Sequence, residues 1–339
     1  MSARLSERIA LNRAFRVGAL WLLALPGTTA LAEPLPEADL SPLISTLGLA
    51  RAEDGAGLPA AGETYWRLTS STASHSSQNA DGSEMSLFDG ETTRSSLAAE
   101  WGVHERYSVG IEVPYLWHES GGLDSFVTRW HNWFGFPNNL RDLVADDRID
   151  FRYADAGTLL LDNQRNQRGI GDIRLTAGWQ WQRDARMAKA LRIAVKLPTG
   201  DPRRLTGSGG TDIALGLVAD YRALGGNPRW SSFYRAHAIL VGKPDRLGER
   251  ARRLIGQVSG GVSFRAWERL TLSAQATLRS QAYDSDLRLL GDPAMLLNVG
   301  GTIRLAERLR LAIAVGEDVR VDTAPDVTIA LSLRYLPAA

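Results

Sequence analysis

The chain has 339 residues, a formal net charge of +1 and no cysteine. The absence of cysteine excludes a disulfide scaffold, Cys-ligated metals and thiol catalysis, and the near-zero charge argues against a nucleic-acid partner. A hydrophobic content of 44% is too low for a bundle of membrane helices, but it is compatible with a membrane β-barrel, whose strands place polar residues at alternate positions.

Residues 1–32 have the organisation of a secretory signal peptide. Four arginines precede an apolar run over 17–25, Pro26-Gly27 follows, and Ala30-Leu31-Ala32 matches a cleavage site. The apolar run is too short to span a bilayer, and no later stretch approaches 18 consecutive apolar residues. We therefore expect cleavage near Ala32 and export from the cytoplasm.

The next segment, residues 33–62, is rich in Pro, Gly and Ala and shows no period. We expect it to be irregular and to form a periplasmic or plug-like segment. Whether it enters a lumen is left open by the sequence.

From residue 63 onward the chain alternates apolar and polar residues, which is typical of strands with one face to each side. In 190–198, for example, Leu191, Ile193 and Val195 alternate with Arg192 and Lys196. Strong alternation predicts strands over 172–182, 190–198, 212–221, 270–279, 309–316 and 327–335. Weaker alternation predicts six more over 63–74, 92–102, 107–118, 230–241, 253–265 and 294–305.

The predicted connections alternate between long and short. The short ones are 103–106, 183–189, 222–229, 266–269 and 306–308, and the long ones are 75–91, 119–171, 199–211, 242–252, 280–293 and 317–326. An up-and-down outer-membrane barrel has this pattern, with short periplasmic turns and longer extracellular loops. We therefore predict an all-β fold, a transmembrane antiparallel barrel of about twelve strands over 63–336, with a long extracellular loop over 119–170.

Aromatic residues gather near the predicted periplasmic ends of the strands. Such positions form a girdle at the membrane interface. The residues are Trp66, Trp101, Tyr107, Trp181, Tyr221, Trp230, Trp267 and Tyr335.

Several motifs resemble the domain-of-unknown-function 3187 family of Gram-negative outer-membrane proteins. They are Gly90-Glu91-Thr92-Thr93-Arg94, Gly-Ile-Glu-Val-Pro-Tyr-Leu-Trp-His over 110–118, Gly121-Gly122-Leu123-Asp124-Ser125-Phe126, Gly169-Ile170-Gly171-Asp172-Ile173-Arg174-Leu175, Lys196-Leu197-Pro198-Thr199-Gly200-Asp201 and Leu205-Thr206-Gly207-Ser208-Gly209-Gly210-Thr211-Asp212. The resemblance implies an outer-membrane barrel and no particular activity. The run over 207–210 lacks the Lys-Ser/Thr of a phosphate-binding loop and precedes a strand, so we interpret it as a connection.

Residues 121–136 show the one helical periodicity. An amphipathic helix there could lie on the outer leaflet, constrict the mouth, or cap the loop, and these alternatives stay open. Its apolar face comprises Leu123, Phe126, Val127, Trp130, Trp133 and Phe134.

Charged residues on the predicted inward face carry a basic excess of eleven positive against five negative groups. The set is Arg67, Arg94, Arg174, Arg192, Lys196, Arg235, Arg265, Arg279, Arg304, Arg310 and Arg334 against Glu100, Glu112, Asp172, Asp212 and Asp220. Twelve strands lie between barrels filled by side chains and barrels that conduct water. These charges therefore predict either an internal salt-bridge network in a narrow lumen, which we favour, or an anion-attracting passage.

An enzymatic alternative rests on His118 and Ser120, which lie on one side of an extended segment. This pair could serve an outer-membrane lipid hydrolase, but no Asn or Asp can be assigned to orient the histidine. No histidines have the spacing of metal ligands.

The sequence thus favours a non-enzymatic outer-membrane protein, a narrow porin-like passive channel for a small, anionic or amphiphilic solute. The alternatives are the lipid hydrolase and a non-conducting structural envelope protein. Expected partners are outer-membrane lipids and lipopolysaccharide, the outer-membrane assembly machinery and the solute, and no cofactor or metal is expected.

Overall fold

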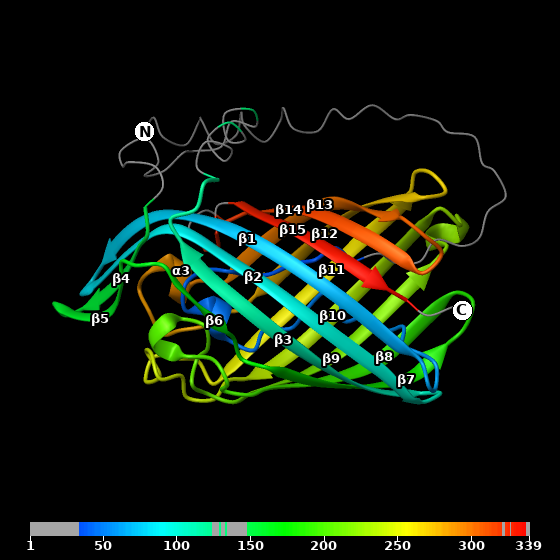
Figure 1. Ribbon diagram of the computed structural model, residues 1–339, viewed down its shortest axis with the longest axis horizontal. Helices are drawn as coiled ribbons and strands as arrows, with labels where there is room; N and C mark the ends of the chain where they lie inside the picture. Colours follow the sequence, from blue (N-terminus) through cyan, green and yellow to red (C-terminus); the bar gives the residue numbers. More distant parts are fainter. Residues whose placement is uncertain are drawn as a thin grey trace, which may run out of the picture.

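Twelve antiparallel strands form the closed wall of a β-barrel in the computed structural model, which describes residues 34–123, 129, 133, 148–320, 323–325 and 327–336 (Figure 1). The wall closes because β1 (Thr64–Asp81) pairs with both β2 (Glu84–His104) and β15 (Val327–Tyr335). The other wall strands are β3 (Tyr107–Glu119), β7 (Arg174–Arg183), β8 (Met187–Lys196), β9 (Asp212–Arg222), β10 (Trp230–Leu240), β11 (Leu254–Arg265), β12 (Leu270–Arg279), β13 (Ala294–Arg304) and β14 (Leu309–Asp318). This confirms the predicted fold class.

The predicted alternation sets the two faces of the wall. In β8 the residues Ala190, Arg192, Ala194 and Lys196 are buried, whereas Ile193 is exposed on the outer face. In a barrel that spans a membrane, the outer face contacts lipid and the inner face lines the lumen. Among the described residues, no helix is long and apolar enough to cross a membrane.

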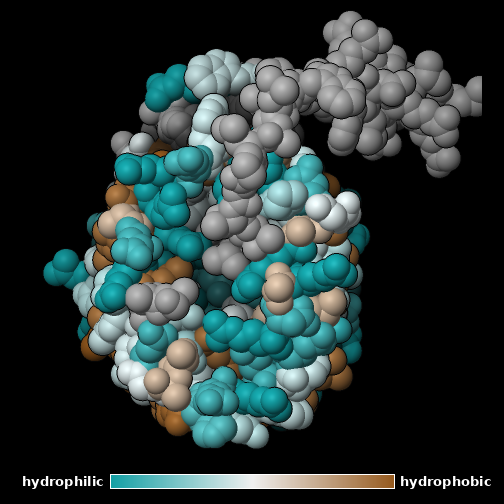
Figure 2. All heavy atoms as spheres, turned by 90° about the vertical axis from the view of Figure 1, so that its right-hand side faces the viewer, coloured by the Kyte–Doolittle hydropathy of each residue, from teal (hydrophilic) through white to brown (hydrophobic). Residues whose placement is uncertain are grey.

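The two ends of the barrel differ. Short turns join the wall strands at one end, which we call the short-turn end. At the other, the long-loop end, the connections are longer except between β1 and β2. Figure 2 looks onto the short-turn end, where hydrophilic side chains surround the mouth and hydrophobic ones lie on the flanks.

The prediction of a long loop over 75–91 is wrong. β1 and β2 run on past the other strands and meet in a tight turn at Gly82–Ser83. The extension of β2 also pairs with β4 (Asp150–Asp155), which forms a hairpin with β5 (Thr158–Asn163). The short strand β6 (Gln167–Ile170) pairs with β3, so the connection after β3 adds to the sheet at the long-loop end.

Residues 34–62, which we call the N-terminal segment, lie inside the barrel (Figure 1). The segment starts at the short-turn end, where the Pro34 carbonyl accepts a hydrogen bond from Arg334, and it turns through the 3-10 helix η1 (Ile44–Thr46). It then returns, and the Gly62 amide donates to the Gly102 carbonyl just before β1. The segment therefore passes up and back through the lumen.

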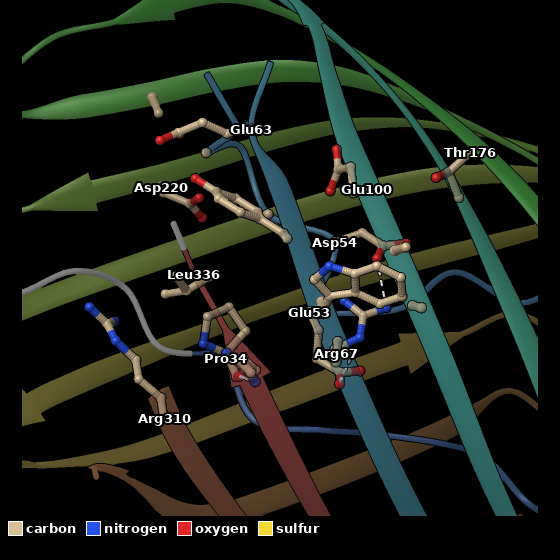
Figure 3. A pocket seen from close by; sticks show the side chains of 18 of the residues that line it. Pro34, Glu53, Asp54, Glu63, Arg67, Glu100, Thr176, Asp220, Arg310 and Leu336 are labelled. Carbon is tan, nitrogen blue, oxygen red and sulfur yellow. Dashed lines mark hydrogen bonds and ion pairs between the residues drawn. The ribbon is translucent and has the colours of Figure 1, made fainter. Parts of the chain in front are cut away.

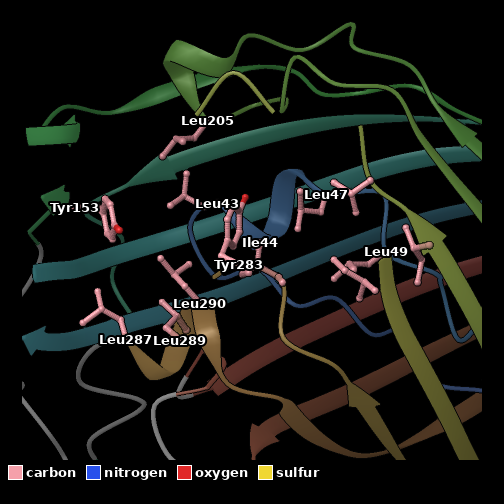
Figure 4. Close-up of a cluster of buried hydrophobic side chains, with 14 of the residues drawn as sticks. Leu43, Ile44, Leu47, Leu49, Tyr153, Leu205, Tyr283, Leu287, Leu289 and Leu290 are labelled. Carbon is pink, nitrogen blue, oxygen red and sulfur yellow. The ribbon is translucent and has the colours of Figure 1, made fainter. Parts of the chain in front are cut away.

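The turn of the N-terminal segment packs into an apolar core in the half of the lumen toward the long loops (Figure 4). Leu43, Ile44 and Leu47 contact a cluster that includes Phe151 and Tyr283. Short helices in the loops complete this end, namely η3 (Pro202–Arg204) and α3 (Arg288–Gly291), and η4 (Leu224–Gly226) lies in a turn at the opposite end. At the long-loop end, the barrel interior is therefore packed like the core of a soluble domain.

We expect Ile44→Ala to lower the free energy of unfolding by about 2–5 kcal/mol, because it removes a fully buried side chain and leaves a cavity. Urea unfolding in lipid vesicles, followed by tryptophan fluorescence, measures this change. Leu224→Ala is the matched control, since Leu224 is exposed in a turn. Equal stabilities of the two variants would show that the segment does not pack in the lumen.

Candidate functional site

The backbone of the N-terminal segment is bonded to side chains of the barrel wall. It has no partner strand, so its buried amides need acceptors from elsewhere. Gln275 accepts from the Leu35 amide at 2.8 Å, and Asp212 accepts from the Gly48 amide at 2.7 Å. Asp220 accepts from the Ala56 amide at 2.8 Å. The polar inner face of the barrel therefore holds the segment in place.

A layer of ion pairs crosses the lumen where the segment returns. Asp54 contacts Arg174 at 2.6 Å and Arg67 at 3.2 Å. Glu112 contacts Arg94 at 2.9 Å, and Arg51 of the segment lies 3.8 Å from the same carboxylate. Because these charges are largely removed from water, each depends on its partners for stability.

Further pairs tie both legs of the segment to the wall. Arg279 contacts Asp39 at 3.2 Å on the first leg, where Glu37 accepts from Thr277 at 2.9 Å. On the second leg, Arg192 donates to the Gly55 carbonyl and also contacts Glu100. The segment contributes four carboxylates and one arginine, a net charge of −3, to a wall with a predicted basic excess.

The glycine-rich motifs converge on one buried lysine. Lys196 contacts Asp172 at 2.6 Å and Asp212 at 3.3 Å, and it donates to the Gly210 carbonyl at 2.8 Å. A Cβ on Gly207 would lie 2.3 Å from a carboxylate oxygen of Asp172, so the loop approaches closely only without a side chain there. Asp172, Lys196, Gly207, Gly210 and Asp212, which we call the Lys196 clasp, thus hold the connection 197–211 against the wall.

Ionic contacts also hold the long-loop end together. Arg250 bridges Glu84 of β2 and Asp155 of β4, and Glu84 accepts from the Tyr153 hydroxyl at 2.9 Å. Hydrogen bonds from Ser83 and Arg250 lower the pKa of Asp155, and burial raises the pKa of Tyr283. Arg250 thus connects three parts of the chain over the apolar core: its own loop after β10, the β1–β2 hairpin and the connection after β3.

A cavity of about 1050 Å³, which we call the chamber, lies at the short-turn end (Figure 3). Asp54, Glu100 and Arg67 line its inner part, and Arg310 and Leu336 line the wall near the mouth. In the turn beside it, the backbone amides of Arg186 and Met187 lower the pKa of Asp184. Toward the long-loop end, residues of the segment such as Leu47 and wall residues such as Arg94 and Lys196 line a void of only about 10 Å³.

The residues predicted to line the lumen occupy inward positions on the wall strands, except Asp172, which lies just before β7 and contacts Lys196. Most are joined in the ion pairs described above, and Arg235 pairs with Asp220 at 2.5 Å. The buried members are Glu112, Asp172, Arg174, Arg192, Lys196, Asp212, Arg235 and Arg279, the half-buried ones are Arg94, Asp220, Arg310 and Arg334, and Arg304 is exposed at the rim.

The predicted girdle residues lie at the short-turn ends of their strands or in the adjoining turns. Seven of them are exposed and Tyr221 is half-buried. Their contact with a membrane interface stays a prediction.

For the predicted loop helix, Phe126, Val127, Trp130 and Phe134 lie outside the described residues. Trp133 is helical and exposed, and the Leu123 amide donates to Glu91. Residues 1–33, with the predicted signal peptide, also lie outside.

His118 is fully buried in the lumen. Its Nδ1 lies 3.1 Å from the Thr92 hydroxyl and its Nε2 lies 3.0 Å from the Leu205 carbonyl. Both ring nitrogens are therefore engaged, which leaves neither to activate Ser120 as a nucleophile. Within the described part of the chain, no group of three or more His, Asp or Glu could hold a metal ion.

Sequence reasoning missed the charged residues of the N-terminal segment itself. Glu37, Asp39, Arg51, Glu53 and Asp54 all contact wall side chains. One feature of the sequence could have indicated these contacts. The five residues are the charged ones in a stretch of mostly apolar and small residues, and the strands that follow are rich in arginine.

The sequence profile of the DUF3187 family, described as a protein of unknown function, matches residues 27–336. No curated protein matches the chain.

Solved structures of similar fold are outer-membrane barrels. The COG4313 outer membrane channel from Pseudomonas putida F1 matches with a TM-score of 0.57 and 14% identity, over 84% of this chain and 98% of that one. The NanC porin matches with a TM-score of 0.44 and 9% identity, over 81% and 100%. The toluene transporter TbuX of Ralstonia pickettii matches with a TM-score of 0.41 and 10% identity, over 89% and 95%.

We expect Lys196→Met to lower the free energy of unfolding by about 3–5 kcal/mol, because it leaves the carboxylates of Asp172 and Asp212 buried without their cation. Urea unfolding in vesicles checks this value. The matched control is Lys243→Met, which removes an exposed pair with Glu249 and should leave stability unchanged. A Lys196→Met protein as stable as the control would contradict the clasp.

Proposed function

The chain belongs to the DUF3187 family, and we propose that it is a passive outer-membrane channel for a small anionic solute, closed by its own N-terminal segment. In this proposal the short-turn end faces the periplasm and the long loops face the exterior, the orientation usual for such barrels. The fold shared with the Pseudomonas putida outer membrane channel is consistent with this assignment.

One observation carries the proposal: a segment that is not part of the wall passes through the lumen and back. Its two ends both lie at the short-turn end, near Arg334 and Gly102. The wall strands hydrogen-bond to one another without it, so the barrel stays closed on itself when the segment withdraws.

The charge of the segment supports an anionic solute. Its carboxylates form ion pairs with arginines on the inner face of the wall. Asp54, for example, pairs with Arg67 and Arg174. Withdrawal of a segment with a net charge of −3 would leave those arginines facing water in the lumen. A pore lined in this way favours anions.

The apolar core favours a second candidate, a non-conducting envelope protein. Leu43, Ile44 and Leu47 are almost fully buried among loop residues, and their separation would expose apolar surface. Conductance measurements separate the two functions.

We expect rare, small, anion-selective openings from the full chain in planar bilayers, and openings on the order of 10–100 times more frequent from the variant E53Q/D54N. The substitutions leave Arg67 and Arg174 without the carboxylates that hold the closed segment. D184N in a short turn is the control. Silence of all three proteins would contradict the channel and leave the envelope role.

A second measurement follows the segment directly. The chain has no cysteine, so Ala56→Cys introduces a single thiol at a fully buried position of the segment. We expect slow modification of this thiol by a membrane-impermeant reagent, and modification at least tenfold faster in the E53Q/D54N background. Ala185→Cys in an exposed turn should react quickly in both backgrounds. Equal rates for Ala56→Cys in both backgrounds would contradict withdrawal.

A further inference from the structure

Four polar side chains on the inner face of β12 and β13 form a group of hydrogen-bond donors, which we call the β12–β13 cradle. Gln275, Thr277 and Arg279 occupy successive inward positions of β12, and Asn298 of β13 lies directly opposite Gln275. Each of the four is at most 3% exposed. On the neighbouring strand a Cβ at Gly316 would lie 2.3 Å from Asn298 Oδ1, so the amide has its place only because this residue is a glycine.

The cradle binds the first acid of the N-terminal segment. Oε2 of Glu37 accepts hydrogen bonds from Gln275 at 3.0 Å, from Thr277 at 2.9 Å and from Asn298 at 2.9 Å. Three uncharged donors thus converge on one carboxyl oxygen. All three belong to strands that pair with each other, so their positions do not depend on the segment.

The second acid of the segment contacts the remaining member of the cradle. Asp39 lies 3.2 Å from Arg279, which also donates to the Ser280 carbonyl at 3.0 Å. The Nε–H of Arg279 is buried and has no hydrogen-bond partner among the described residues. Guanidinium groups bind carboxylates most strongly through two parallel N–H donors. Asp39, which is fixed to the backbone of the segment, therefore uses only part of what Arg279 offers to a carboxylate.

The two contacts are spaced alike on the wall and on the segment. Thr277 and Arg279 lie two residues apart on one face of a strand, which places their Cα atoms about 7 Å apart. Glu37 and Asp39 are likewise two residues apart in the segment. The strands β12 and β13 contain no acidic residue of their own, so both carboxyl groups in the cradle come from the segment.

We propose that the β12–β13 cradle is the recognition site for a dicarboxylate solute, and that Glu37 and Asp39 occupy it as an internal mimic of that solute. The inference deepens the proposed function and rests on it, because the solute reaches the cradle only when the segment leaves. The apparent affinity for the solute is then the intrinsic affinity reduced by the fraction of molecules whose cradle is vacated. A change that weakens the hold of the segment on the cradle should tighten the binding of the solute.

The test titrates the purified full chain in detergent with adipate and, in a parallel arm, with monomethyl adipate, which lacks the second carboxylate. Isothermal titration calorimetry at constant ionic strength measures both affinities. We expect E37Q/D39N to bind adipate at least tenfold more tightly than the unaltered chain, because hydrogen bonds to uncharged acceptors are weaker than those to carboxylates. It should bind the monomethyl ester at least tenfold more weakly than adipate. The single variant D39N is measured alongside, so that a folding defect of the double variant does not end the test.

Substitutions in the cradle assign the bound adipate to this site. R279Q and N298A, each added to E37Q/D39N, should weaken adipate binding tenfold or more. They are made separately, so that the loss of one folded protein leaves the other to decide.

The matched control is E249Q/D284N, which makes the same two kinds of substitution at exposed acids of the long-loop end. It should bind adipate as the unaltered chain does. No saturable binding by E37Q/D39N, or an affinity equal to that of the unaltered chain, would overturn the cradle as a recognition site. Equal affinities for adipate and its monomethyl ester would overturn the dicarboxylate.

The channel and the cradle can fail separately. Adipate binding that is lost in both R279Q and N298A, together with silent bilayers for E53Q/D54N, would keep the site and overturn the channel. Anion-selective openings of E53Q/D54N, together with adipate binding that neither cradle substitution weakens, would keep the channel and overturn the site.

Discussion

Every part of this molecule depends on one constraint: peptide N–H and C=O groups removed from water must be bonded within the protein. The wall meets it through the closure of β1 on β15. The N-terminal segment cannot meet it that way, because it is irregular and lies alone in the lumen. Side chains such as Gln275 and Asp212 supply its partners. The polar inner face of the barrel, needed to alternate with a lipid-facing outer face, therefore also serves as the binding surface for the segment.

The sequence predicts the wall well because lipid on one side and polar contacts on the other impose a period of two on each strand. The prediction fails where that constraint ends. β1 and β2 extend past the other strands through residues 75–91, a Ser-rich stretch in which Phe88 packs against Phe151 of β4 in the apolar core, so the regular alternation of a membrane-facing strand is not required there. The position of the N-terminal segment cannot be predicted for the same reason, because no membrane-facing alternation applies to it. Leu35 and Gln275 are 240 residues apart, and a segment without a period carries no sign of such partners.

The motifs illustrate a different limit. The glycines identify loops and strand ends at residues 169–172, 196–201 and 205–212. The sequence does not show that these three segments meet at one place in the folded chain. They meet around Lys196, whose ammonium group needs the carboxylates of Asp172 and Asp212. A buried lysine is stable only when such partners surround it, so the clasp fixes the path of the connection 197–211. That connection in turn places the Leu205 carbonyl against His118, which makes the histidine part of the lumen packing.

In the proposed function, closure of the lumen and selection of anions have the same electrostatic origin. The wall holds more arginine than acid, and the N-terminal segment brings carboxylates, Asp39 to Arg279 and Asp54 to Arg67 and Arg174. The segment thus acts as an internal counter-ion. An anion with equal affinity for the closed and open barrels would not change their balance. An anion that binds those arginines only after the segment has left would compete with it and shift the population toward the open barrel.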